Sequence, residues 1–238
     1  MKLSVIFLFV VMFLGVFEAS AQKIMANSHR LRVAHLVNDL DIQKLDDPAW
    51  STAPEVAITS YWSGNTAPSG RQFKARLLWS ATALYIRFEA NQMEPLIVSD
   101  KPDLTQKIKG LWDRDVCEIF IAPNKAARNK YYEFEIAPTG EWIDLGIVVT
   151  PKKRLTDLDY ASGMTSAVSN EKEKVTMAIK IPFSSLGKTP MVGDIWLGNL
   201  FRCVGKDPTR GYLAWQPTRT KQPAFHVPKA FGEFQFVK

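Results

Sequence analysis

Apolar and polar residues alternate with a period of two along most of the chain. The alternation is clearest in the segments 73–79, 84–88, 131–136, 143–147, 174–181 and 195–203, and turn-forming residues separate them. Successive side chains of a strand point to opposite faces, so this pattern predicts antiparallel strands with one buried face. Residues 31–37 are expected to form a short edge strand. The sequence contains no long amphipathic helix, and only residues 182–187 suggest a single helical turn, which Gly187 ends.

An order of strands throughout predicts an all-β fold, namely a two-sheet antiparallel β-sandwich of jelly-roll or immunoglobulin-like type. Residues 22–238 contain no linker, repeat or low-complexity tract, which indicates a single domain.

One acidic residue interrupts the pattern. Residues 116–122 read as an apolar strand, and Glu118 is the carboxylate within it. A buried carboxylate without a partner is costly. Glu118 therefore either pairs with a basic side chain of a neighbouring strand or reaches into a site whose aromatic wall is Trp112. Structural ion pairs outnumber functional carboxylates, so residue chemistry alone favours the ion pair.

The first residues are expected to be removed. Lys2, the apolar run 3–17 and the small residues 19–21 are typical of a secretory signal at residues 1–21. The run of 15 residues is shorter than a membrane span, which needs about 20. No other segment approaches it. The sequence therefore predicts a mature chain, 22–238, that is secreted or periplasmic and has no membrane span.

Charge and motifs narrow the function further. The net charge of +6 comes from dispersed Lys and Arg residues, which argues against a nucleic-acid partner. The three histidines have no metal-ligand spacing, and no G-x-S-x-G or C-x-x-C-H motif is present. The acid-rich stretches 38–41 and 100–103 are most simply turn formers.

Several motifs, in order, resemble those of the family 9 carbohydrate-binding modules and their close relatives. The motifs are Asp46-Asp-Pro-Ala-Trp50, Leu77-Leu-Trp-Ser-Ala-Thr-Ala-Leu-Tyr-Ile86, Trp112-Asp-Arg-Asp-Val-Cys-Glu-Ile-Phe120, Tyr131-Tyr-Glu-Phe134, Ile181-Pro-Phe-Ser-Ser-Leu186, Leu213-Ala-Trp-Gln-Pro217, Phe225-His-Val-Pro228 and Phe231-Gly232. Together they span nearly the whole mature chain. The resemblance implies a β-sandwich that binds sugars without catalysis.

The resemblance also implies a site in which two aromatic rings grip a terminal sugar. Trp112 matches the first ring. Phe225 stands at the second, where members that bind xylan or cellulose typically have Trp. Aromatic rings cover the apolar face of a pyranose, while polar groups bond its hydroxyl rim. The candidates for that rim are Glu118, which matches the family's strand-borne acid, Glu135, which falls where characterised members have a cationic group, and Arg202 and Gln222, which are candidates to replace that group.

The implied partner is an oligo- or polysaccharide, with a glycoside hydrolase acting beside the module in polysaccharide breakdown. No cofactor is implied, although relatives often carry structural calcium, for which the acid-rich loops are candidates. Three other functions remain open. The first is a glycoside hydrolase that uses Glu118 and Glu135 as paired acids. The second is a haem-binding electron-transfer domain, which needs axial ligands such as His and Met. The third is a purely structural interaction module.

Cys117 and Cys203 are the only cysteines. Cys117 has the parity of Ile119, and Cys203 has the parity of Leu197 and Phe201, so both sulfurs are expected to point into the core. A disulfide and a pair of buried free thiols are equally compatible with this expectation.

Overall fold

The structure is a computed structural model that describes residues 29–238. The expected signal at residues 1–21 lies outside the described residues. The strands are β1 (Arg30–His35), β2 (Val56–Ile58), β3 (Phe73–Trp79), β4 (Ala83–Asn91), β5 (Val116–Ala122), β6 (Lys130–Ile136), β7 (Trp142–Val149), β8 (Arg154–Asp157), β9 (Thr165–Asn170), β10 (Lys174–Pro182), β11 (Ile195–Val204), β12 (Gly211–Ala214) and β13 (Gly232–Phe236).

The helical elements in the described residues are short 3₁₀ turns. They are η1 (Pro48–Thr52), η2 (Ser69–Arg71), η3 (Leu111–Asp113), η4 (Lys125–Ala127), η5 (Phe183–Leu186) and η6 (Pro228–Ala230). The turn η5 confirms the helical turn predicted there, and Gly187 ends it in the left-handed region with φ of +69°. Across residues 29–238, no helix has the length and apolar character needed to cross a membrane.

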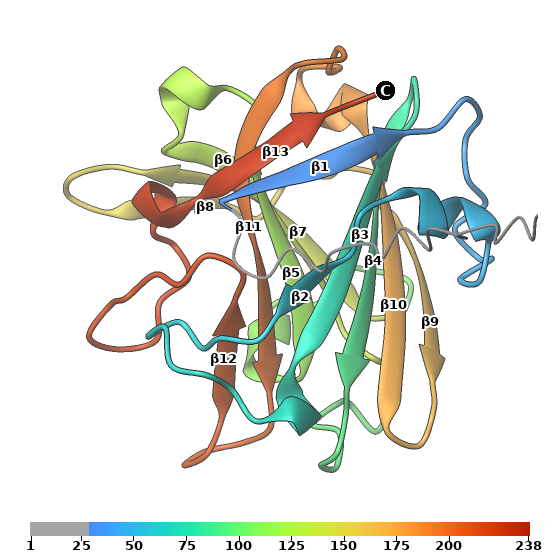
Figure 1. Cartoon of the computed structure of the whole chain (residues 1–238). Coiled ribbons are helices and arrows are strands. Elements are labelled where there is room, and N and C mark those ends of the chain that lie inside the picture. The colour runs from blue at the N-terminus through green and yellow to red at the C-terminus, as the bar shows by residue number, and fades with distance from the viewer. Residues whose placement is uncertain (1–28) are drawn as a thin grey trace, which may run out of the picture.

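The strands form two layers that are joined at β1 (Figure 1). The first sheet has the order β8-β7-β6-β5-β11-β13, with β12 beside β11; the second has the order β3-β4-β10-β9, with β2 beside β3. Neighbouring strands are antiparallel except at β1, which runs parallel to both β13 and β3. The predicted all-β sandwich in a single domain is confirmed.

Strand β1 differs from the expected edge strand, because it lies between the two sheets and connects them. Arg30 to Val33 pair with β13, and Ala34 and His35 pair with Leu78 and Trp79 of β3. Its alternate side chains, Leu31 and Val33, are buried. Arg30 and Arg32, on the opposite face, are exposed, so this part of β1 has one buried face.

The main core lies between the two sheets. Ile119, Phe134 and Leu200 of the first sheet belong to one buried cluster with Ile86 and Ile179 of the second. Each such side chain stabilises the fold by about 1.5–3 kcal/mol relative to an exposed one. A second apolar cluster covers the other face of the first sheet. We call the face toward the second sheet the inner face and the opposite one the outer face.

The structure corrects the prediction that both cysteine sulfurs point into the core between the sheets. Both are buried free thiols, so the disulfide alternative is wrong. Cys117 lies in the inner-face cluster, whereas Cys203 lies in the outer-face cluster. On β11 the inner face is formed by Trp196, Leu200 and Val204. The odd-numbered residues that were expected to mark the core therefore face outward.

Candidate functional site

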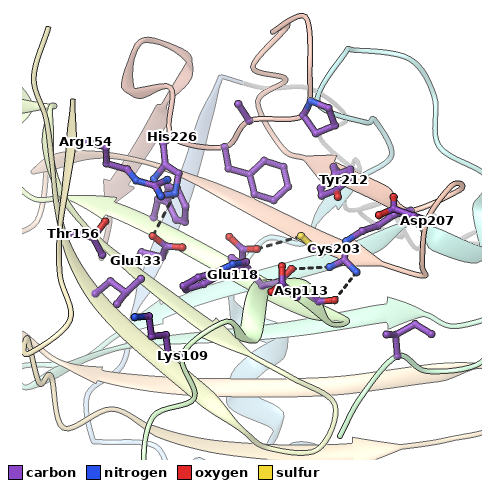
Figure 2. A pocket seen from close by; sticks show the side chains of 18 of the residues that line it. Lys109, Asp113, Glu118, Glu133, Arg154, Thr156, Cys203, Asp207, Tyr212 and His226 are labelled. Atoms are coloured by element: carbon purple, nitrogen blue, oxygen red, sulfur yellow. Dashed lines mark hydrogen bonds and ion pairs between the residues drawn. The ribbon is translucent and has the colours of Figure 1, made fainter. Parts of the chain in front are cut away.

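A cavity of about 690 Å³ opens on the outer face of the first sheet (Figure 2). Its floor includes Glu118 and Phe120 of β5, Glu133 of β6 and Cys203 of β11. Because strand side chains alternate, residues two apart share this face. The walls come from η3, from β8 and from the segment 223–226. Segments that are far apart in the chain therefore meet at one site.

Trp112 stands on the cavity wall in the turn η3. Gly110 precedes the turn with φ of +84°, a conformation that glycine adopts without strain. Leu111 is buried and anchors the turn, whereas Trp112 is 37% exposed. Arg210 donates hydrogen bonds to the carbonyl oxygens of Trp112 at 2.7 Å and Asp113 at 2.9 Å. The backbone around the exposed ring is thus held in place.

Phe225 lines the same cavity but is far more buried, at 9% exposure. Its ring stacks on Phe201 of β11, with ring centroids 4.1 Å apart and planes at 11°. Phe225 therefore offers the cavity a ring that is supported from behind, in contrast to the exposed ring of Trp112.

Three carboxylates meet beneath the cavity. Glu118 of β5 is in register with Glu135 of β6, and Glu133 is two residues earlier on β6. Their exposures are 2%, 0% and 3% for Glu118, Glu135 and Glu133, and one oxygen of each lies within 4.8 Å of the others. Glu118 and Glu133 line the cavity, and Glu135 lies behind them.

The ion pair expected for Glu118 is wrong. Among residues 29–238, no Lys, Arg or His lies within 4.0 Å of its carboxylate oxygens. The Glu118 carboxylate instead accepts a hydrogen bond from the Cys203 thiol, at 3.5 Å. Figure 2 shows this contact between the labelled side chains. The second alternative, a carboxylate that reaches into a site, matches the geometry.

Burial strongly perturbs these acids. It raises the pKa of Glu133 to about 7. The pKa of Glu118 is raised by burial and then by the charge of Glu133, and that of Glu135 by burial and then by both neighbours. No nitrogen or hydroxyl of residues 29–238 donates to Glu135, so its only hydrogen-bonding neighbour is a protonated Glu133. The cluster does not carry three negative charges at neutral pH without a compensating cation.

His226 stands over the cluster (Figure 2). Its Nε2 is 3.8 Å from Oε2 of Glu133, and its Nδ1 is 2.8 Å from the Tyr131 hydroxyl. Burial lowers the pKa of His226 to about 3, so the imidazole is neutral at physiological pH. Sequence reasoning missed both His226 and Glu133. The parity of Glu133 with Glu135 on one strand was the signal that pointed to it.

Two candidates are not at the cavity. Arg202 lies on the inner face, where its Nη1 donates to the carbonyl oxygens of Arg71 and Asn91, both at 2.7 Å. Gln222 is in an exposed loop, and its carbonyl oxygen accepts from Thr220. Charged side chains that do line the cavity are Lys109, Asp113, Arg154, Lys206, Asp207 and Arg210.

Two carboxylates of the acid-rich loops, Asp39 and Asp103, accept hydrogen bonds from neighbouring side chains. The Asp39 carboxylate accepts from the Ser80 hydroxyl at 2.6 Å and from the Thr82 hydroxyl at 2.8 Å. The Asp103 carboxylate accepts from Thr105 and Gln106 within its own turn. Asp103 therefore has the expected role of a turn former, whereas Asp39 links the segment after β1 to the turn between β3 and β4.

Residues 42–238 match the family model described as carbohydrate family 9 binding domain-like. The chain belongs to this family, as the motif order implied.

Solved structures show the same fold. A protein from Bacteroides uniformis ATCC 8492, described as "a putative carbohydrate-binding protein", is 17% identical, with a TM-score of 0.67 over 87% of this chain and 98% of that chain. A family 9 carbohydrate-binding module from Caldicellulosiruptor kristjanssonii, solved with cellotriose, is 16% identical, with a TM-score of 0.61 over 87% and 93% of the two chains. The structure with glucose has a TM-score of 0.60, with 16% identity over 87% and 95%. No curated protein matches the chain.

Proposed function

We propose that this protein is an exported, non-catalytic carbohydrate-binding protein that holds a sugar in the outer-face cavity. The observation that carries the proposal is that Trp112 and Phe225, from distant parts of the chain, line one cavity whose floor contains Glu118. Membership of the family supports it, as do the relatives from Caldicellulosiruptor kristjanssonii solved with cellotriose and glucose.

The chemistry of the cavity suits a sugar. Its volume of about 690 Å³ falls within the range of about 300–1,000 Å³ that is usual for small-molecule sites. Trp112 offers an exposed ring to the apolar face of a pyranose. Glu118 and Glu133 on the floor can accept hydrogen bonds from sugar hydroxyls, and the cationic side chains of the rim can donate to hydroxyl oxygens.

Of the sequence-predicted contacts, we retain Trp112, Phe225 and Glu118 and add Glu133. Glu135 is fully buried behind Glu118, so it acts by supporting the floor. Arg202 and Gln222 are left out because neither lines the cavity. The secretory signal at residues 1–21 and a role beside a glycoside hydrolase complete the proposal.

Titration calorimetry of the mature chain tests this function. We expect binding in the micromolar to millimolar range to at least one class among cello-, xylo- and host-type oligosaccharides, because a shallow site buries little area. A matched control is Met191→Ala, whose side chain is 70% exposed and does not line the cavity. If no oligosaccharide produces heat, the purely structural module is the better reading.

The hydrolase alternative has its own test. Glu118 and Glu133 are the acids on the cavity floor that a substrate could reach, and Asp113 and Asp207 also line the cavity. We expect no reducing sugar from any of the same oligosaccharides. Sugar release by the wild type that disappears in Glu118→Gln would instead establish a hydrolase.

A further inference from the structure

We propose that Glu118, Glu133 and Glu135 bind one divalent first-row transition-metal ion at the floor of the outer-face cavity. This site does not depend on sugar binding, and it is separate from the acid-rich loops considered for calcium.

The spacing of the carboxylates matches the shell of one ion. One oxygen of each lies within 4.8 Å of the other two. Metal–oxygen bonds of about 2.0–2.4 Å place ligands on opposite sides of an ion about 4–4.8 Å apart. The backbone fixes this spacing, because Glu118 and Glu135 are directly opposed across β5 and β6, and Glu133 shares their face. No strand has to move for the three side chains to touch one ion.

A second observation is the unsatisfied state of Glu135. Its side chain is fully buried, and within residues 29–238 no nitrogen or hydroxyl donates to either oxygen. Oε2 of Glu133 also lacks a hydrogen bond. Buried polar atoms are nearly always hydrogen-bonded, and buried charges are paired or coordinate metals. These oxygens point into the cluster, where a cation supplies the missing partner.

The surroundings favour a transition metal over magnesium or calcium. Nε2 of His226 lies 3.8 Å from Oε2 of Glu133, and Nδ1 lies 2.8 Å from the Tyr131 hydroxyl. Among residues 29–238, the ligand atoms that lie within 4.8 Å of one another belong to the three glutamates alone, so His226 stands beside this set and not within it. The Cys203 thiol lies 3.5 Å from Glu118. Nitrogen and sulfur beside an oxygen-rich set suit manganese, iron or zinc ions.

The charge balance is also favourable. Three carboxylates and one divalent ion leave a net charge of −1. Arg154, which is labelled beside His226 in Figure 2, lies close enough for its positive charge to act on Glu133. The remaining negative charge therefore has a counter-charge at the cavity wall.

The test is a Mn²⁺ titration of the mature chain after treatment with EDTA, without sugar. We expect one equivalent to bind, measured by loss of the free Mn²⁺ electron-paramagnetic-resonance signal, and Zn²⁺ to displace it. Glu135→Gln and Glu118→Gln should weaken binding by at least about 100-fold, because the change of a single supporting side chain already costs about 10–100-fold. The matched control is Glu171→Gln, an exposed acid in the turn before β10, which should bind as the wild type does.

A second measurement locates the ion in the wild type without any variant. Bound Mn²⁺ should broaden the ring-proton signals of His226 and leave those of His35, on β1, sharp. No uptake of either metal by folded wild type up to about 1 mM overturns the proposal and leaves shared protons as the means of holding the cluster together. Uptake that broadens His35 instead, or that Glu171→Gln removes, overturns it as well. Since no sugar is present, failure here leaves the proposed function untouched.

Discussion

Both faces of the first sheet bury charged side chains, but the hydrogen bonding of these side chains differs between the faces. On the inner face, Arg202 is 3% exposed and donates to the carbonyl oxygens of Arg71 and Asn91 and to the side chain of Gln92. On the outer face, Glu135 is 0% exposed and receives no hydrogen bond from a nitrogen or hydroxyl in residues 29–238. Equal burial thus accompanies several hydrogen bonds in one place and almost none in the other.

This difference in hydrogen bonding indicates a structural role for Arg202 and a role in a binding site for Glu135. A buried charge with all its bonds made holds chain segments together, and its removal leaves the partners orphaned. A buried charge without bonds is a cost that the fold tolerates, and such groups gather where a ligand or ion completes them. The two faces can therefore be told apart by experiment, because equivalent substitutions should change different properties.

The largest expected effect is on the inner face. Arg202→Met keeps most of the side-chain volume but leaves the carbonyl oxygens of Arg71 and Asn91 without their donor. We expect unfolding free energy to fall by about 3–5 kcal/mol, as measured by urea denaturation. Sugar affinity of the folded fraction should not change. A loss below about 1 kcal/mol would show that Arg202 is not a scaffold residue.

On the outer face, we expect the free energy of unfolding to depend on pH. Burial raises the pKa of Glu133 to about 7 in the folded chain, whereas the unfolded value is near 4.5. The folded state therefore binds more protons between these values, and stability falls as pH rises from about 4.5 through 7. We expect this carboxyl group alone to contribute a loss of about 1–3 kcal/mol between pH 5 and 7.5 in metal-free protein.

The matched variant for this prediction is Glu133→Gln, which keeps the shape and removes the titration. Urea denaturation at both pH values, with EDTA present, should show that the change in stability from pH 5 to 7.5 is more favourable by about 1–3 kcal/mol in the variant than in the wild type. His226 works in the opposite direction, because its depressed pKa makes stability fall as pH drops below about 6.5. Because the two groups offset each other in the wild type, the test is the difference between the proteins, and a variant with the same pH dependence as the wild type would contradict the outer-face assignment.

The substitution Trp112→Ala should weaken sugar binding with little effect on stability. Its side chain is 37% exposed, so Trp112→Ala should change unfolding free energy by less than about 1 kcal/mol. A core tryptophan would cost about 3–5 kcal/mol. We expect calorimetry to show at least a tenfold loss of sugar affinity, which corresponds to about 1.4 kcal/mol. The contrasting variant is Phe225→Ala, which should also lower the melting temperature because Phe225 stacks on Phe201.

The inner face was predictable from sequence, and the outer face only in part. Period-two alternation and turn residues are local signals, and they were sufficient for the sandwich. On β11, however, both faces are apolar, since Leu200 faces the second sheet and Phe201 the outer cluster. When both faces of a strand are apolar, alternation does not show which face points to the second sheet. The sequence therefore predicted the wrong face for Cys203.

The carboxylate cluster depends on register, which is not a local property. Glu118 and Glu135 oppose each other because β5 and β6 pair at one offset; a shift of one residue would move one of them to the other face. The sequence identified Glu118 as unusual within its strand. The shared parity of Glu133 and Glu135 was visible as well, but the register that places both acids next to Glu118 was not.

The smallest expected effect compares the two cysteines, one on each face. Cys117 is 0% exposed within the core between the sheets, and Cys203 is 3% exposed at the cavity floor. Burial raises the pKa of both thiols, Cys117 to about 12, so labelling of the native protein should be slow at each. A small alkylating reagent enters through the cavity, so it should reach Cys203 first by a modest factor, measured by peptide mass spectrometry.

In urea without reductant, intact mass should show two labels. No label there would restore the disulfide, and faster labelling of Cys117 would reverse the face assignment.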